Sequence, residues 1–121
     1  MKLRFISPTF HGIIDYSAAV LLIAGPFLLK LGESSPLAVT LSVITGFAVI
    51  LVSIITKYKF ALTKVIPFDL HLAIDLSVAT AFAIIPFVLN FKGLDAIYYV
   101  ANSVIVFLVV AFTENKEAVI I

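Results

Sequence analysis

The sequence predicts an all-α membrane protein whose four transmembrane helices form two tandem helical hairpins, arranged as a parallel repeat. Two observations support this prediction, the composition of the chain and an internal repeat. The chain has 121 residues, of which 63% are hydrophobic and 12% are charged. Soluble domains are about half apolar and about a quarter charged. A chain this short cannot hide so much apolar surface in one core, so we expect a lipid bilayer to surround it.

Two stretches of the chain, residues 10–29 and 70–89, repeat each other at a constant offset of 60 positions. Eight of their twenty aligned residues are identical. The matched polar and proline pairs are His11 and His71, Asp15 and Asp75, Ser17 and Ser77, and Pro26 and Pro86. A shared apolar composition does not explain His, Asp and Pro matched in register, so the repeat indicates a duplicated unit.

Four apolar segments are long enough for membrane helices, which need about 20 residues each. We expect helices over residues 8–30 and 34–56 in a first hairpin (1–60), and over 67–90 and 95–113 in a second (61–121). Ser7 before Pro8 is typical of a helix start, because serine caps free N–H groups and proline lacks one. A cleaved signal peptide is the rival interpretation of the first segment. The second copy of this segment, at residues 70–89, lies in mid-chain and cannot be a signal peptide. We therefore interpret the first segment as a membrane helix.

Each hairpin contains two spans, an even number, so both copies are expected to point the same way. The second helices match less well at the offset of 60, mainly at Phe47 with Phe107 and Val49 with Val109. Under this arrangement the two His/Asp pairs should lie at the same depth, near the end of the bundle that carries both termini.

Lysine and arginine are unevenly distributed between the two sets of loops. The termini and the central loop carry six, namely Lys2, Arg4, Lys57, Lys59, Lys64 and Lys116, and the outer turns carry Lys30 and Lys92. Because cytoplasmic loops are enriched in positive charge, we expect both termini in the cytoplasm and the chain in the cell (inner) membrane. The central basic loop is interpreted as an orientation signal that can also contact anionic lipids.

The two His/Asp pairs are the candidate functional residues. Residues four positions apart share one helix face, and ionisable groups in a membrane face the bundle interior. Pooled, His11, Asp15, His71 and Asp75 would suit Zn²⁺, Fe²⁺ or Mn²⁺, or would relay protons. We favour a structural role, in which each Asp accepts from the imidazole one turn away or from free N–H groups of the first helical turn. Haem ligation by both histidines has no support in the sequence beyond the histidines themselves.

Two further features concern helix ends and helix contacts. Pro26 and Pro86 fall late in their helices, where they kink or terminate them, and we favour termination. The small residues Thr45, Gly46 and Ser53 would let another helix approach closely in lipid. They predict association of this chain with itself or with a larger membrane complex.

Several functions are excluded or disfavoured by the sequence. There is no cysteine, and there is no Gly-rich phosphate loop, nucleophile elbow or His-Glu-x-x-His motif. The net charge of +1 gives no strong field for nucleic acid. We therefore expect a non-enzymatic helical bundle that self-associates or joins a membrane complex. The alternative is a carrier or sensor of a metal ion or proton that uses the His/Asp residues.

The duplicated opening, His11-Gly-Ile-Ile-Asp15-Tyr, resembles the start of the units in SPW-repeat membrane proteins of bacteria and archaea. That family is built from a two-span unit, often duplicated, with a Ser-Pro-Trp signature late in the first span. Here Gly25-Pro26-Phe27 and Ile85-Pro86-Phe87 keep the proline and an aromatic residue but lack Ser and Trp. The resemblance covers the whole chain and implies the two-hairpin architecture, with no catalytic activity to carry over.

Overall fold

The computed structural model describes residues 3–114, which form four α-helices. They are α1 (Pro8–Leu28), α2 (Leu37–Ile54), α3 (Phe68–Val88) and α4 (Gly93–Phe112). All four are long and apolar enough to cross a membrane, which confirms the predicted fold class and makes this a multi-pass membrane protein. Lys116, counted above among the basic residues, lies outside the described residues.

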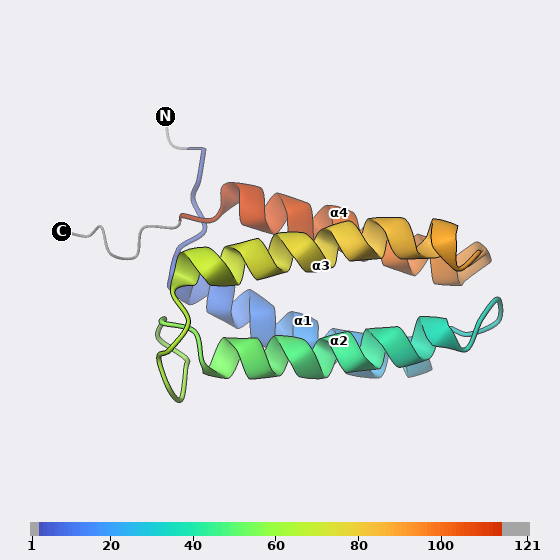
Figure 1. The fold of residues 1–121 in the computed structure, drawn as a ribbon, viewed down its shortest axis with the longest axis horizontal. Coiled ribbons are helices and arrows are strands. Elements are labelled where there is room, and N and C mark those ends of the chain that lie inside the picture. The colour runs from blue at the N-terminus through green and yellow to red at the C-terminus, as the bar shows by residue number, and fades with distance from the viewer. Residues whose placement is uncertain (1–2, 115–121) are drawn as a thin grey trace.

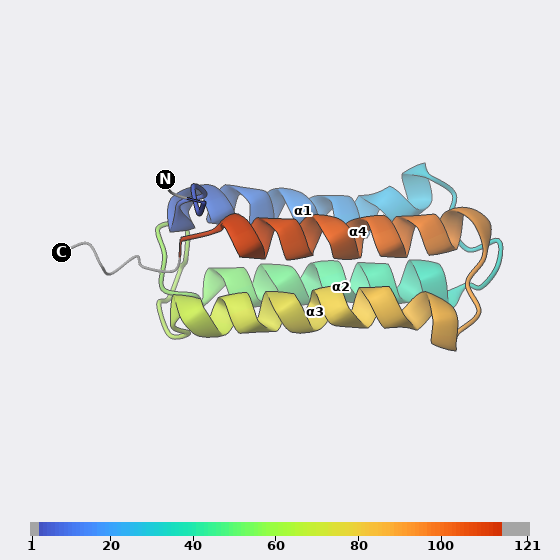
Figure 2. The ribbon, with the colours of Figure 1, turned by 90° about the horizontal axis from the view of Figure 1, so that it is seen from above.

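The helices form two antiparallel hairpins that pack side by side (Figure 1). The closest helix pairs are α1 with α2 and α3 with α4. Seen from above, α1 lies beside α4 and α2 lies beside α3 (Figure 2). Helices α1 and α3 therefore face each other across the diagonal of the bundle, and both begin at the end where the described chain starts and finishes. The two hairpins thus run in the same direction, as the parallel repeat predicts.

The spacing between equivalent residues differs for the first and second helices of the two hairpins, as two matching backbone contacts show. Ile6 pairs with Thr113 and Ile66 pairs with Thr56, each through one isolated β-bridge. The isoleucines are 60 positions apart, whereas the threonines are 57 apart. The sequence comparison at 60 therefore misaligned the second helices, because the turn after α1 is longer than the turn after α3.

The first helix of each hairpin begins and ends as its sequence dictates. Ser7 caps α1, where its hydroxyl accepts a hydrogen bond from the Phe10 N–H at 3.1 Å. The carbonyls of Pro26 and Pro86 accept from the N–H groups five residues later, at 2.8 and 2.9 Å. Between these partners Lys30 and Asn90 adopt positive φ angles of 56° and 58°. This is the Schellman arrangement, in which a left-handed residue closes the helix end, so each helix ends two residues after its proline.

The proline in α1 also shapes a contact between helices. A proline lacks the N–H that would bond to the carbonyl four residues earlier, which here is that of Leu22. The Ser42 hydroxyl of α2 donates to this carbonyl at 2.8 Å, and the Tyr98 hydroxyl lies 2.6 Å from Ser42 Oγ. The freed carbonyl therefore gains a partner from α2, and Tyr98 links this contact to the second hairpin.

The small-residue face of α2 packs inside the first hairpin. A Cβ atom added to Gly46 would lie 2.6 Å from Ile23 Cγ1 and 2.9 Å from the Ala19 carbonyl oxygen. Ser53 is also fully buried within the chain. The expectation that this face meets another chain needs correction at Gly46, because α1 already covers that residue. Self-association through another surface stays a prediction.

A single carboxylate joins the hairpins at the end remote from the termini. Asp95, at the start of α4, is 2% exposed and accepts from Gly32 N at 2.8 Å. It also accepts from Ser34 N at 3.0 Å, from Ser34 Oγ at 2.6 Å and from Ser35 N at 3.4 Å. The turn between α1 and α2 is thereby bound to the second hairpin.

Candidate metal centre

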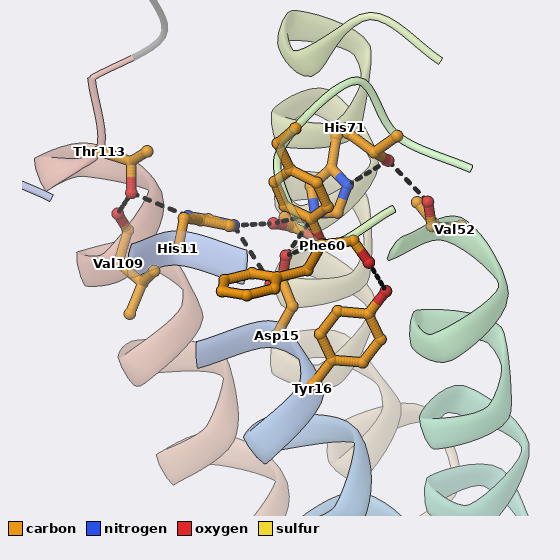
Figure 3. A network of polar contacts seen from close by, with 11 residues as sticks. His11, Asp15, Tyr16, Val52, Phe60, His71, Val109 and Thr113 are labelled. Atoms are coloured by element: carbon orange, nitrogen blue, oxygen red, sulfur yellow. Dashed lines mark hydrogen bonds and ion pairs between the residues drawn. The ribbon is translucent and has the colours of Figure 1, made fainter. Parts of the chain in front are cut away.

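The four candidate residues converge on the bundle axis. His11 and Asp15 lie in the first two turns of α1, and His71 and Asp75 lie in the first two turns of α3. Because α1 and α3 face each other across the diagonal and begin at the same end, these side chains meet (Figure 3). One nitrogen or oxygen from each residue lies within 4.8 Å of all the others. The residues that the repeat singled out therefore form one cluster rather than two separate pairs.

Within this His/Asp cluster each histidine contacts both carboxylates. His11 Nε2 lies 3.2 Å from Asp15 Oδ1 and 2.9 Å from Asp75 Oδ2. His71 Nε2 lies 2.9 Å from Asp15 Oδ2 and 3.4 Å from Asp75 Oδ2. The contacts within one helix and those across the diagonal have similar lengths, so the cluster belongs to the two hairpins jointly.

Three of the four cluster residues are buried, Asp75 is half-buried, and the surroundings are largely apolar. His11 is 0% exposed, His71 1% and Asp15 6%. The Phe68 ring packs against both imidazoles, with ring centroids 5.4 Å from that of His11 and 5.8 Å from that of His71. Charged groups in such surroundings are costly unless they are paired or coordinate a metal ion, so the arrangement demands a compensating positive charge.

Two threonines set the orientation of the imidazoles. Thr113 Oγ1 lies 2.9 Å from His11 Nδ1, and Thr56 Oγ1 lies 2.8 Å from His71 Nδ1. Figure 3 shows Thr113 between His11 and the carbonyl of Val109. Sequence analysis missed both threonines. They correspond at the offset of 57, and an alignment of the second helices at that offset would have paired them.

The loop between α2 and α3 covers the cluster at the terminal end of the bundle, which is the end where α1 and α3 begin. The Tyr58 hydroxyl donates to Asp15 Oδ2 at 3.0 Å, and burial raises the pKa of this phenol, which keeps it a donor. The Tyr16 hydroxyl donates to the Phe60 carbonyl at 2.9 Å (Figure 3). Lys64 Nζ donates to the Tyr58 carbonyl at 2.5 Å. The basic loop, expected to set orientation and to contact anionic lipids, therefore also closes the site.

A small cavity borders the cluster on its other side, between α2 and α3. Its volume is about 30 Å³, and it is lined by His71, Asp75 and mostly apolar side chains that include Val49 and Val78. Its volume exceeds the roughly 10–15 Å³ that one water requires. By size alone the cavity would admit one water, but most of its lining offers no hydrogen-bond partner.

The donor set fits a small tetrahedral ion. Zinc binds histidine nitrogen and carboxylate oxygen at about 2.0–2.2 Å, which gives about 3.3–3.6 Å between neighbouring ligand atoms. The four Nε2–oxygen separations of 2.9–3.4 Å are close to that spacing. One ligand atom from each residue lies within 4.8 Å of the others, so the widest separation would have to shorten around a bound ion. Calcium prefers six to eight oxygen ligands and magnesium an octahedron. The site therefore favours a zinc-like ion over both.

Comparison with known proteins identifies the family of this chain. The family model described as the SPW repeat domain matches residues 9–114. Neither the comparison with curated proteins nor that with solved structures gives a match. The matched range includes all four helices, the His/Asp cluster and the two prolines. The chain therefore belongs to the SPW repeat domain family.

Proposed function

We propose that this membrane protein binds one divalent metal ion of the zinc class in the His/Asp cluster. The observation that carries the proposal is that the Nε2 atoms of both imidazoles lie within 3.4 Å of the same two carboxylates. Each Nδ1 is already engaged by a threonine hydroxyl. A neutral histidine whose Nδ1 carries the proton has its lone pair on Nε2, the atom that a metal ion would bind.

The balance of charge supports a divalent ion. Two ionised aspartates and two neutral histidines carry a charge of −2, which one divalent cation would cancel. His71 Nε2 is buried and makes no hydrogen bond of acceptable geometry to any residue in the described range, although two carboxylate oxygens lie within 3.4 Å of it. An ion at the centre would give this nitrogen a partner.

The number of ligands favours a non-enzymatic role. Four protein ligands close a tetrahedral site, whereas catalytic zinc sites keep one position open for water or substrate. Two ligands come from each hairpin, and the closest helix pairs lie within the hairpins. A bound ion would therefore tie the hairpins together. We infer a bundle whose packing responds to metal, as in a sensor or a small carrier.

Protons are the second candidate ligand. In the absence of an ion, a nitrogen and a carboxylate oxygen 2.9 Å apart, as His11 and Asp75 are, need a proton between them. The same cluster would then hold protons in an ion-paired state and could relay them. The two functions are separated by whether a metal ion binds with defined stoichiometry.

The test is metal binding by the purified protein in mild detergent. We expect one zinc ion per chain by elemental analysis after loading and washing, weaker binding of Mn²⁺, and no retention of Mg²⁺. Asp15→Asn and Asp75→Asn should each lose the ion. Asp69→Asn is the matched control, because Asp69 is an exposed carboxylate in the first turn of α3. A loaded wild-type sample without bound metal would reject the metal site and favour the proton function.

A double-mutant cycle tests whether the cluster acts as one site. Each single Asp→Asn change should abolish binding, and the double change should add no further loss. Their effects on the free energy of unfolding should also be non-additive, as is usual for residues in contact. Simple additivity in both measurements would mean two independent structural pairs.

We also propose that both termini lie in the cytoplasm and that the chain resides in the cell (inner) membrane. The six-to-two distribution of Lys and Arg supports this orientation. Reporters fused after Lys59 and after Ile121 should read cytoplasmic, and one in the turn at 32–35 should read external. An external reading after Lys59 would reverse the orientation and move the His/Asp cluster to the opposite face.

A further inference from the structure

The two threonines beside the imidazoles make the same contacts at both ends of the cluster. Thr113 Oγ1 lies 2.5 Å from the Val109 carbonyl oxygen, and Thr56 Oγ1 lies 2.6 Å from the Val52 carbonyl oxygen. Each hydroxyl also contacts one histidine Nδ1. Both threonines are fully buried, so water does not compete for these hydrogen bonds.

The direction of each hydrogen bond follows from the number of protons available. A threonine hydroxyl has one hydrogen, and a carbonyl oxygen can only accept. The short hydroxyl–carbonyl distances therefore assign that hydrogen to the carbonyl. The remaining lone pairs of Oγ1 accept, so the proton between Oγ1 and Nδ1 belongs to the imidazole. Each threonine thereby holds its histidine with Nδ1 protonated, which leaves the lone pair on Nε2, the ring nitrogen next to the carboxylates.

The backbone holds both threonines in place. The Ile6 N–H donates to the Phe112 carbonyl at 2.9 Å, and the Ile66 N–H donates to the Ile55 carbonyl at 2.8 Å. In each case the segment that precedes a first helix crosses the end of a second helix, next to the threonine. The hydroxyls are therefore anchored independently of the cluster and would keep their positions when it changes its ligand.

We propose that Thr56 and Thr113 are positioning residues that fix the tautomer and ring orientation of His71 and His11 for metal binding. This inference rests on the proposed metal site. Groups that hold a ligating histidine through its other ring nitrogen typically change metal affinity about 10–100-fold when they are removed. The duplication gives each histidine its own threonine, so loss of one should impair one ligand and loss of both should impair two.

The experiment measures zinc affinity by competition with a chelator in mild detergent. Thr56→Val and Thr113→Val should each weaken binding by about 10–100-fold, and Thr→Ser at either position should restore it. Thr80→Val is the matched control. The Thr80 hydroxyl donates to the Leu76 carbonyl at 2.8 Å on the exposed surface of α3, away from either histidine. This control should bind zinc as the wild type does.

A spectroscopic readout separates positioning from general stability. In ¹⁵N-labelled protein, the wild type should show protected protons on Nδ1 of both histidines. Thr56→Val should remove this protection for His71 alone, and Thr113→Val for His11 alone. Wild-type zinc affinity and unchanged ring signals in both valine variants would overturn the inference. If a valine variant fails to fold, the serine variants and the wild-type spectrum still decide, because a wild-type Nδ1 without a proton contradicts the assignment.

The outcome also distinguishes this inference from the proposed function. A wild type that binds zinc, with valine variants that bind equally well, defeats the positioning role and leaves the metal site standing. A wild type that binds no zinc defeats the metal site itself. In that case the role in metal binding falls with it, and the ring spectra report whether the threonines orient the histidines at all.

Discussion

The two ends of the bundle both bury carboxylates between the hairpins, but they surround them differently. At the remote end Asp95 accepts from the backbone and side chain of a single turn, and every group that contacts it there is a donor. At the terminal end Asp15 and Asp75 lie beside two imidazoles whose Nδ1 atoms contact threonine hydroxyls, and Asp15 also accepts from the Tyr58 hydroxyl. The remote carboxylate has its partners built in, whereas the cluster needs an additional positive charge.

This difference separates structural from functional burial of charge. A buried carboxylate that accepts several hydrogen bonds from fixed N–H groups is stable as it stands. Carboxylates and lone pairs that face one another need a proton or a metal ion between them. Burial alone therefore does not mark a functional site, and the direction of the surrounding donors is the better criterion.

Asp95→Ala should have the largest effect on stability. It removes the acceptor for the N–H groups of Gly32 and Ser34 and for the Ser34 hydroxyl. We expect the free energy of unfolding in mild detergent to fall by about 3 kcal/mol, because unsatisfied donors cost roughly 1–3 kcal/mol each and water can reach some of them. Chemical unfolding followed by circular dichroism measures this change.

The folded fraction of Asp95→Ala should still bind zinc as the wild type does, because the cluster lies at the opposite end of the bundle (Figure 1). If Asp95→Ala instead lost zinc binding and kept the stability of the wild type, Asp95 would be functional rather than structural.

Zinc itself should have the next largest effect. A ligand that binds only the folded state at 100 times its dissociation constant adds about 2.7 kcal/mol to the free energy of unfolding. We expect this gain in the wild type and in Asp69→Asn, and no gain in Asp75→Asn. The same unfolding measurement with and without zinc checks it. An equal gain in Asp75→Asn would show that zinc stabilises the protein from somewhere other than the cluster.

Much of the fold could be predicted because the membrane leaves few alternatives. A chain surrounded by lipid must satisfy its backbone within helices, so apolar length alone gave the four spans. The repeat then supplied the direction of the hairpins and the matched depth of His11 and His71. These features depend on local sequence and on symmetry, and both are visible in one chain.

The rest depends on contacts between distant segments. Nothing near Gly46 in the sequence says whether α1 or another chain covers it, because both would favour a small residue. Asp95 follows a turn, and nothing near it in the sequence indicates its burial, because its donors lie about 60 positions earlier. Thr56 and Thr113 escaped notice because the turn after α1 is longer and shifts the second helices out of the register of the first.

The smallest expected effect tests how much the Ser34 hydroxyl contributes to holding Asp95, compared with the backbone N–H groups of the same turn. Ser34 Oγ donates to Asp95 Oδ2 at 2.6 Å and accepts from the Lys92 N–H at 3.0 Å. Ser34→Ala removes both bonds but leaves Asp95 the N–H groups of Gly32 and Ser34 itself. Because Ser34 is exposed, water can replace the hydroxyl, so the free energy of unfolding should fall by only about 1 kcal/mol. Glu33→Ala, at an exposed neighbour, should change it less. A loss as large as that of Asp95→Ala would mean that one serine hydroxyl, rather than the backbone of the turn, secures the carboxylate at this end.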